Sequence, residues 1–350
     1  MENSKKTSGL KTFVNPRFRA IFCTVVLLSL GVLGCVWSQS LSDPELKDHW
    51  DISWSQDGNR LAVAGDLGIF IFNEEFEEIA HSDTTANSIV WGPNDEMLVT
   101  GSGETISFWD SENLASKVTF DVGPIFALDW HLDRNLLAGK VNSRTAQGWT
   151  FLVKTWAVRQ DESGNIVDFP EQQSVSIGDF TWFVWSPDGA QIATSDIDGM
   201  IQIWDVENGE LRTSIQYPGN TSLTIAPSIA WNQRGKLVGV RGENAIYLWD
   251  TQTGQLVNSF NGYVWNAQYI AWSPDGNRFA ISARNYVYIV DSNTGSVLNE
   301  IESNPDNYIT HIVWGPNNFL IAGIGAIGTK PTTWVWNSET GEEIAYIPTE

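Results

Sequence analysis

Histidine side chains are common metal ligands and acid–base catalysts, and this chain has four of them, His49, His81, His131 and His311. They are far apart in the sequence and occupy unmatched positions in the repeated units described below. A metal site needs clustered ligands, so this spacing does not predict one. The chain also lacks a Gly-x-Ser-x-Gly nucleophile motif and a phosphate-binding loop that ends in Lys-Ser or Lys-Thr. We therefore predict no catalytic residue, no metal site and no cofactor.

Cysteine chemistry is confined to an apolar segment near the start of the chain. The two cysteines are Cys23 and Cys35, so residues 36–350 have no disulfide framework and no thiol nucleophile. Residues 1–19 are polar and basic and residues 20–37 are apolar, which is the order of a secretory signal. The run Val32-Leu33-Gly34-Cys35 resembles the bacterial lipobox, in which a cysteine that follows a small residue becomes diacylated. This resemblance implies that Cys35 carries lipid.

Two other interpretations of this segment stay open. Its apolar run of 18 residues is about the minimum for a membrane span, so the segment could be an uncleaved anchor. Alternatively, ordinary signal cleavage near Val36-Trp37-Ser38 would release the protein. All three interpretations place the rest of the chain outside the cytoplasm, attached to the cell membrane by a lipid or an anchor, or secreted. Membrane contact is expected only through this segment.

The elements that must position any functional side chain follow from a pattern that recurs seven times. In each copy an apolar residue, one spacer and a tryptophan precede a turn, and apolar residues two apart predict a strand with one buried face. The seven tryptophans, which we predict to be structural, are Trp54, Trp91, Trp130, Trp185, Trp231, Trp272 and Trp314. The intervals between them are 37, 39, 55, 46, 41 and 42 residues.

A turn and three further strands follow each of these tryptophans. Ser186-Pro187-Asp188-Gly189 and Ser273-Pro274-Asp275-Gly276 have the residues that tight turns prefer. We expect the aspartates of such turns, including Asp57, to cap the backbone rather than to bind calcium. Four antiparallel strands in about 40 residues make one blade of a β-propeller. The predicted fold is therefore all-β, a seven-bladed propeller of four-stranded antiparallel blades with almost no helix after residue 45.

Three of the third strands end in Trp-Asp: Phe108-Trp109-Asp110, Ile203-Trp204-Asp205 and Leu248-Trp249-Asp250. These segments and the Trp-Ser-Pro-Asp-Gly turns resemble the repeats of the WD-repeat β-propeller family, and of its bacterial members in particular, over about residues 50–350. The Gly-His pair of that family is absent, because no histidine follows a glycine. The buried hydrogen-bond tetrad that family members build on this histidine is therefore not expected here.

Each predicted blade is contiguous in the sequence. Many WD-repeat propellers complete their last blade with an N-terminal strand, but here the last unit has its own fourth strand at residues 342–347. The first unit likewise has its own at residues 77–81. The long third unit contains two predicted loop insertions, residues 142–148 and residues 159–169.

Charge and composition divide the chain into a signal or anchor at residues 1–37, a short tether at residues 38–48 and the propeller at residues 49–350. The net charge is −22 at pH 7, and residues 1–34 carry five basic residues and one glutamate, so the remainder carries −26. An acidic body of this size repels the phosphates of nucleic acids and of anionic lipids. We therefore predict no nucleic-acid partner.

The candidate partner-binding site is a set of aromatic residues that lie shortly before five of the seven tryptophans. Because each of them enters its blade from the same end, they would surround one mouth of the central channel: Trp50, Phe126, Trp182, Trp265 and Tyr308. Exposed aromatic side chains are frequent anchors of interfaces. The predicted function is that of an extracytoplasmic scaffold that binds a protein or a peptide, with a glycan as a further ligand class.

Two alternatives to a scaffold remain. One is a propeller hydrolase or lyase, which would need an interior cluster of acids or histidines from three or more innermost strands. The candidates on the first strands are Asp51, Asp129 and His311, and we expect them at exposed strand edges instead. The other alternative is a purely structural envelope protein without a dedicated ligand.

Overall fold

The computed structural model describes residues 51–145, 148–178, 180–218, 228–241, 245–261, 267–304, 307–327 and 330–348. The chain divides into two units, Met1–Ser42 and Asp43–Glu350, and all described residues belong to the second. The predicted signal and tether, with Cys35, lie outside the described residues, as do Trp50 and Trp265. No helix in the described part is long and apolar enough to cross a membrane.

The described residues form seven four-stranded antiparallel sheets, which we number as blades 1 to 7 in chain order. Blades 1 and 2 contain β1 (Asp51–Trp54), β2 (Leu61–Gly65), β3 (Gly68–Phe72) and β4 (Glu78–Ser82), then β5 (Ser88–Trp91), β6 (Met97–Ser102), β7 (Thr105–Asp110) and β8 (Ser116–Asp121). Blade 3 contains β9 (Ile125–His131), β10 (Leu136–Thr145), β11 (Gly148–Ala157) and β14 (Glu171–Gly178). A separate two-stranded hairpin, β12 (Arg159–Gln160) and β13 (Ile166–Asp168), lies between its last two strands in the sequence.

The remaining blades follow the same order. Blades 4 and 5 contain β15 (Phe180–Trp185), β16 (Gln191–Asp196), β17 (Met200–Asp205) and β18 (Leu211–Gln216), then β19 (Ser228–Trp231), β20 (Lys236–Arg241), β21 (Ala245–Asp250) and β22 (Leu256–Asn261). Blades 6 and 7 contain β23 (Ala267–Trp272), β24 (Arg278–Ala283), β25 (Tyr286–Asp291) and β26 (Val297–Glu302), then β27 (Asn307–Trp314), β28 (Leu320–Ile327), β29 (Lys330–Asn337) and β30 (Glu343–Pro348).

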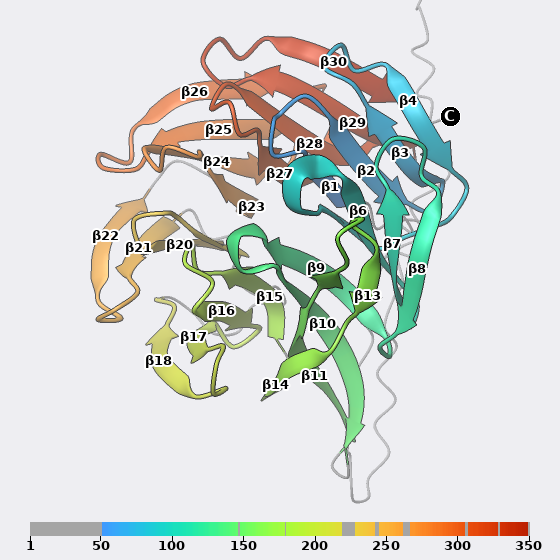
Figure 1. Cartoon of the computed structure of the whole chain (residues 1–350). Coiled ribbons are helices and arrows are strands. Elements are labelled where there is room, and N and C mark those ends of the chain that lie inside the picture. Colours follow the sequence, from blue (N-terminus) through green and yellow to red (C-terminus); the bar gives the residue numbers. More distant parts are fainter. Residues whose placement is uncertain are drawn as a thin grey trace, which may run out of the picture. The chain divides into compact units, whose positions relative to one another are not determined.

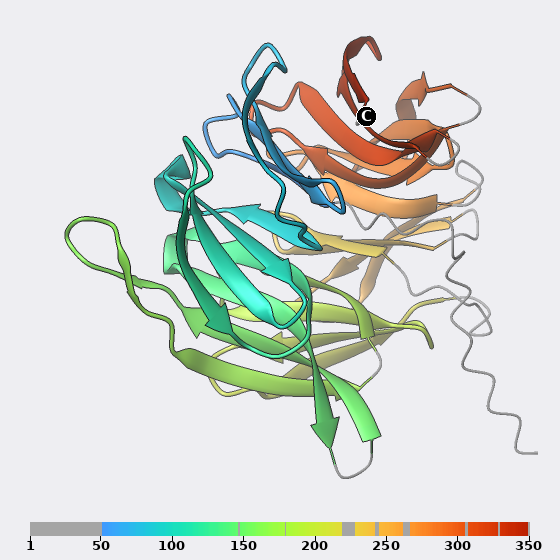
Figure 2. The ribbon, with the colours of Figure 1, turned by 90° about the vertical axis from the view of Figure 1, so that its right-hand side faces the viewer.

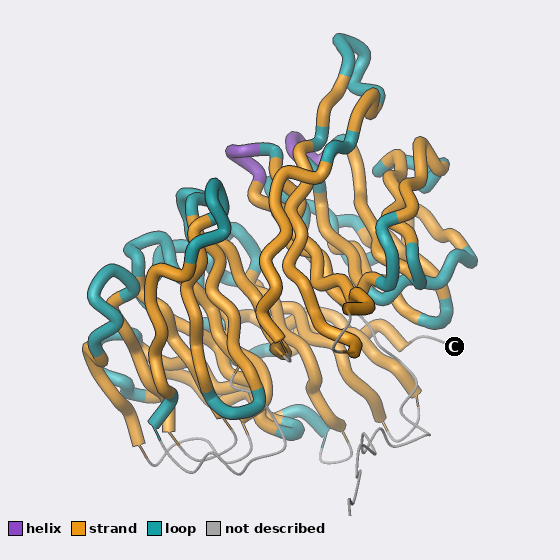
Figure 3. The backbone as a smooth tube through the Cα atoms, turned by 90° about the horizontal axis from the view of Figure 1, so that it is seen from below, coloured by secondary structure: helices purple, strands orange, loops and turns teal. Residues whose placement is uncertain are grey.

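The blades form a closed ring. The first strand of each blade lies innermost and contacts the first strand of the next, and β27 contacts β1 (Figure 1). Within the described ranges, helical structure is limited to two 3₁₀ turns, η1 (Pro93–Asp95) and η2 (Leu132–Arg134) (Figure 3). These features confirm the prediction of an all-β propeller with four-stranded antiparallel blades. Within the described residues the last blade ends on β30 and every four-stranded sheet is contiguous in the sequence, as predicted.

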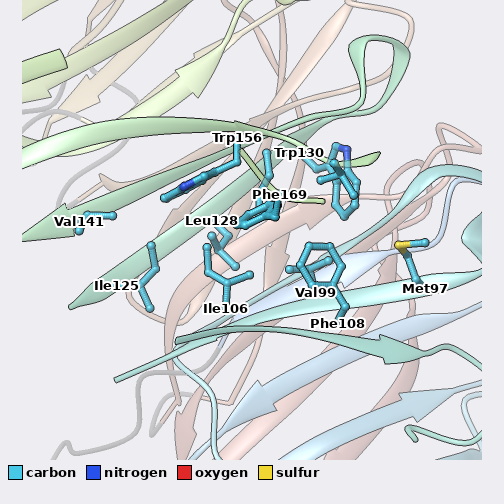
Figure 4. Close-up of a cluster of buried hydrophobic side chains, with 12 residues drawn as sticks. Met97, Val99, Ile106, Phe108, Ile125, Leu128, Trp130, Val141, Trp156 and Phe169 are labelled. Atoms are coloured by element: carbon cyan, nitrogen blue, oxygen red, sulfur yellow. The ribbon is translucent and has the colours of Figure 1, made fainter. Parts of the chain in front are cut away.

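The repeated tryptophans hold neighbouring blades together. Ile89 and Trp91 of β5 pack against blade 1, and Leu128 and Trp130 of β9 pack against blade 2 (Figure 4). Several of these indoles also donate a hydrogen bond to the preceding blade. Trp91 Nε1 lies 2.9 Å from the carbonyl oxygen of Ser53, and equivalent bonds join Trp185 to Asp129 and Trp272 to Ala230. Their predicted structural role is confirmed.

A second repeated position accommodates the tryptophan of the third strand. In blades 2 and 4 it is a threonine: Trp109 Nε1 donates to Thr100 Oγ1 at 2.8 Å, and Trp204 donates to Thr194 at 3.1 Å. In blade 7 it is Gly323, where an added Cβ would lie 2.8 Å from the Trp336 ring. Blades 2 and 4 thus keep a short polar link although the Gly-His pair of the WD-repeat pattern is absent.

We expect Thr100→Val to lower the free energy of unfolding by about 1–3 kcal/mol, because it leaves the buried N–H of Trp109 without an acceptor while conserving volume. Thr119→Val is the matched control, since Thr119 shares only an exposed hydrogen bond with Ser107. Urea denaturation of both variants measures the difference. Equal stabilities of the two variants would mean that the Trp109 bond contributes nothing.

The turns after the first strands are capped as predicted. Asp57 Oδ1 accepts from the Asn59 amide at 3.0 Å, and Asp275 Oδ1 accepts from the Asn277 amide at 3.0 Å. An arginine then reaches from the same blade to the next one. Arg60 lies 4.6 Å from the Trp91 ring centroid and donates to the Asp95 carbonyl at 2.8 Å. The side chains of these turns therefore serve the blade junctions.

Both predicted insertions in blade 3 are ordered differently from simple loops. Residues 142–145 belong to β10 and residue 148 to β11, so the first insertion lengthens a hairpin. The second contains the hairpin β12–β13, which projects from the ring (Figure 2). Phe169 at its end is buried against Phe108, Phe120 and Trp156. Both loop predictions were wrong. For the second insertion the reason is that the sequence does not show that Phe169 belongs to the core of blades 2 and 3.

Candidate functional site

Four innermost strands carry a β-bulge at the same position. The residue four places before the repeated tryptophan is skipped in the pairing with the second strand: Phe126 in β9, Thr181 in β15, Gln268 in β23 and Thr310 in β27. A bulge bends a strand and redirects the side chains beside it. The residue after the bulge is Trp182 in β15, Tyr269 in β23 and His311 in β27. The equivalent residues of β1 and β5 are Asp51 and Ser88.

These residues meet inside the ring. Trp182 and Tyr269 have ring centroids 5.0 Å apart although blade 5 separates their blades in chain order, so their contact spans the inner side of β19. Tyr269 lies 4.0 Å from the His311 ring, and His311 Nδ1 lies 3.2 Å from Asp51 Oδ1. The side chains of Asp51 and His311 are only 16% and 18% exposed. We call this set, with Ser88, the channel network.

Asp51 continues the channel network into blades 2 and 3. Its Oδ2 atom accepts hydrogen bonds from Ser88 Oγ at 2.6 Å and from the Ile89 amide at 2.9 Å. Ser88 Oγ in turn accepts from the Leu128 amide at 3.0 Å. A chain of contacts therefore runs from Trp182 of blade 4 through blades 6, 7, 1 and 2 to Leu128 of blade 3. It joins six of the seven blades. It includes the junction between blades 7 and 1, which no shared strand covers.

Burial and pairing shift the acidity of the network in opposite directions. Burial alone would raise the pKa of Asp51, but the hydrogen bond and charge of His311 and the bonds from Ser88 and Ile89 together lower it. For the neighbouring Asp129, burial raises the pKa to about 6, although backbone hydrogen bonds from Trp185 and Trp130 and the charge of His131 act in the opposite direction. Burial and both carboxylates also raise the pKa of Tyr269.

The prediction that Asp51, Asp129 and His311 lie at exposed strand edges was therefore wrong. All three are half-buried in the ring interior, and His311 contacts Asp51 although no histidine was expected to converge on the central channel. The sequence signal was that Asp51 and His311 each stand three residues before a repeated tryptophan. The geometry does not build a nucleophile, however. Ser88 Oγ donates to the carboxylate of Asp51 and not to His311, so the serine–histidine pair of a hydrolase triad is not formed here.

The predicted aromatic site is only partly formed. Phe126 and Tyr308 are 47% and 40% exposed at the end of the ring where the innermost strands begin. Trp182 instead is half-buried in the channel network. Two apolar residues at the same end were missed, because they lie in short polar turns: Leu67 between β2 and β3 is 42% exposed, and Ile197 between β16 and β17 is 45% exposed. We call these four exposed residues the entry face.

The opposite mouth, where the turns after the first strands converge, holds a recess of about 640 Å³. It is lined by Gln56, Trp130, His131, Asp133, Trp185, Ser186, Pro187, Asp188, Trp231 and Gln233. His131 Nε2 lies 3.0 Å from the Pro187 carbonyl and its Nδ1 accepts from the Arg134 amide at 3.3 Å, which fixes the wall between blades 3 and 4. In the described part of the chain, no group of three or more His, Cys, Asp or Glu residues is arranged to hold a metal ion.

Two segments of the chain match the model of the family described as "WD domain, G-beta repeat", residues 75–110 and residues 172–205. Each match runs from the fourth-strand region of one unit to the Trp-Asp or Phe-Trp-Asp end of the next third strand, at Asp110 and Asp205. These are the segments whose Trp109 and Trp204 donate to threonines.

Curated relatives with the same repeats are distant. The chain is 25% identical over 236 residues to the transcriptional corepressor LEUNIG_HOMOLOG of Arabidopsis thaliana, covering 62% of this chain and 27% of that protein. It is 22% identical over 226 residues to the APC/C activator protein CDC20 of Saccharomyces cerevisiae, covering 60% and 33%. WD repeat-containing protein 82 of Drosophila melanogaster is 26% identical over 179 residues, covering 50% and 53%. The chain thus spans about a third or less of the first two relatives.

Proposed function

We propose that this chain, a β-propeller that carries WD40 repeats, is a scaffold that binds a protein or peptide on its entry face. The observation that carries the proposal is the exposure of Leu67, Phe126, Ile197 and Tyr308, which come from blades 1, 3, 4 and 7 and lie at one end of the ring. Exposed large apolar residues that gather on one surface mark interaction sites. The names of the two relatives, a corepressor and an activator protein, support a scaffold over an enzyme.

An enzymatic alternative would use the acids and histidine of the ring interior. Asp51, Asp129 and His311 come from three innermost strands, which is the cluster that such an enzyme needs. The polar atoms of Asp51 and His311 are engaged with one another and with Ser88 and Ile89. Tyr269 packs against both His311 and Trp182. This arrangement favours a structural role, so the proposed function has no catalytic residue.

The double variant Phe126→Ser, Tyr308→Ser tests the entry face. A well-packed aromatic anchor contributes on the order of 2 kcal/mol, so each substitution is expected to weaken partner binding by about 30-fold. The measurement is affinity capture from the cells of origin, followed by quantitative mass spectrometry. Phe319→Ser is the matched control, because Phe319 is 49% exposed in a turn at the opposite end. Identical captured sets for the double variant and wild type, at equal melting temperature, would exclude the entry face.

We further propose that a bacterial cell exports the propeller and holds it outside the cytoplasm by lipid on Cys35. The support is the lipobox-like run that ends at Cys35, after a basic and an apolar stretch. Labelled palmitate is expected to enter wild type and Cys23→Ala but not Cys35→Ala. Equal label in all three proteins would refute lipidation of Cys35 and leave an anchor or free secretion.

A further inference from the structure

The recess at the mouth opposite the entry face has the size of a ligand site. Its volume of about 640 Å³ lies within the range of about 300–1,000 Å³ that is typical of ligand pockets. Side chains from blades 1, 3, 4 and 5 line it, so its shape depends on the closed ring. The entry face contributes none of the lining residues.

Several polar groups of the recess are available to a ligand. Asp133 and Gln233 are exposed and have no hydrogen-bond partner in the described part of the protein. Asp188 is engaged on one side, where its Oδ1 accepts from Ser186 Oγ at 2.7 Å and from the Ala190 amide at 3.0 Å. These bonds, and more weakly the charge of Arg134, hold the pKa of Asp188 below its usual range, so it is ionised at neutral pH.

The charge of the lining favours a cation. Its ionised side chains are the carboxylates of Asp133 and Asp188, and no lysine or arginine is among the lining residues. The charge of Arg134 acts on Asp188 and offsets part of this negative charge, whereas two other arginines at this end of the ring point their guanidinium groups at blade junctions. Arg234 donates to the Asp275 carbonyl at 3.1 Å, and Arg278 donates to the Asn318 carbonyl at 3.1 Å.

Aromatic rings complete the recess. Trp130 and Trp185 are buried and present little more than their edges, whereas Trp231 is half-buried. A half-buried indole can receive the aliphatic stem of a long side chain and attract its cationic end. Carboxylates, an amide and an indole around one recess suit arginine and lysine better than an acidic or a purely apolar group.

We propose that this recess binds a basic peptide segment, with an arginine or lysine side chain held by the carboxylates of Asp133 and Asp188 and its stem against Trp231. The site is separate from the entry face, so the propeller has a ligand site at each mouth. The net charge of −22 adds a long-range attraction for such a segment, which speeds encounter without selecting the recess.

Fluorescence anisotropy with the full chain in detergent tests the proposal. The probes are fluorescein-labelled nonapeptides of glycine and serine with a central Arg-Ala-Arg, Glu-Ala-Glu or Leu-Ala-Leu, in about 0.15 M salt to screen distant charges. The arginine peptide is expected to bind wild type at least about tenfold more tightly than the other two. We expect the double variant Asp133→Asn, Asp188→Asn to bind the arginine peptide about tenfold more weakly than wild type does. We expect the same loss for the single variant Gln233→Arg.

The control pair Asp83→Asn, Asp275→Asn removes the same charge outside the recess, and Asp275 caps a turn equivalent to that of Asp188. It is expected to change the affinity by less than about twofold. Equal weakening by both pairs, or no preference for the arginine peptide, would overturn the proposal. If the double variant Asp133→Asn, Asp188→Asn has a lower melting temperature than wild type, the affinity of Gln233→Arg for the arginine peptide decides whether the recess is the site. Phe126→Ser, Tyr308→Ser is expected to leave this affinity unchanged, so the two sites can fail separately.

Discussion

Asp51→Ala is expected to lower the free energy of unfolding by about 3 kcal/mol at neutral pH. The substitution removes the acceptor of Ser88 Oγ and of the Ile89 amide and leaves His311 unpaired at the junction of blades 7 and 1. Removing one partner of a buried pair is costly because the other partner stays desolvated. Urea denaturation followed by tryptophan fluorescence measures the loss.

The matched control for Asp51 is Asp83→Ala. Asp83 also lies beside a histidine, with His81 Nε2 at 3.5 Å, but its own side chain is fully exposed. Exposed ion pairs add little to stability, so no measurable change is expected. If the two substitutions cost the same, the channel network does not close the ring.

The effect of Asp51 also has a defined pH dependence. Its pKa is lowered in the folded state, so its contribution is complete above the unfolded value near 3.9 and is lost as the pH falls through the folded value. The stability difference between wild type and Asp51→Ala is therefore expected to shrink only below about pH 4. A difference that already changed between pH 8 and pH 6 would contradict this dependence on Asp51.

Asp129→Asn is expected to act in the opposite direction and to raise the free energy of unfolding by about 1–3 kcal/mol at pH 7.5. Burial raises the pKa of Asp129 to about 6, so the folded protein holds this proton more tightly than the unfolded chain does. Wild type should then lose stability as the pH rises from about 4 to about 6 and level off above it. Asparagine cannot ionise, so the variant avoids this loss.

The measurement for Asp129 is the stability difference between variant and wild type from pH 4 to pH 8. It is expected to be near zero at pH 4 and to reach its plateau above pH 6. Asp161→Asn serves as the control, because the bonds from Asn165 lower the pKa of Asp161 in an exposed hairpin turn. A difference for Asp129→Asn that is constant with pH would show that desolvation of the carboxylate is not its cause.

The sequence predicted the blades because their signals are local. An apolar residue two places before each tryptophan fixes a buried strand face, and Ser-Pro-Asp-Gly fixes the turn that follows. The missing strand exchange was also predictable, since residues 342–347 already had the pattern of an outer strand. The long hairpin of β10 and β11 was not, because residues 142–145 lack the apolar alternation of a buried strand.

The channel network could be predicted only in part. Asp51 and His311 stand three residues before their tryptophans, as do Trp182 and Tyr269, and this shared position was visible in the sequence. Their meeting depends on bulges in β15, β23 and β27 and on closure of the ring, and neither is a local property. For the same reason Trp182 was grouped with Phe126 and Tyr308, although it contacts Tyr269 in the interior.

Contiguous blades also determine how such a chain tolerates rearrangement. Every hydrogen-bonded strand ladder in the described residues lies within a single stretch of sequence, and side chains alone join β27 to β1. The backbone can therefore be opened at any connection between two blades, and the old ends linked, without cutting a sheet. Circular permutants that start between blades would keep all seven sheets, and whole-blade duplication or deletion would alter the circumference of the ring while each remaining blade stays intact.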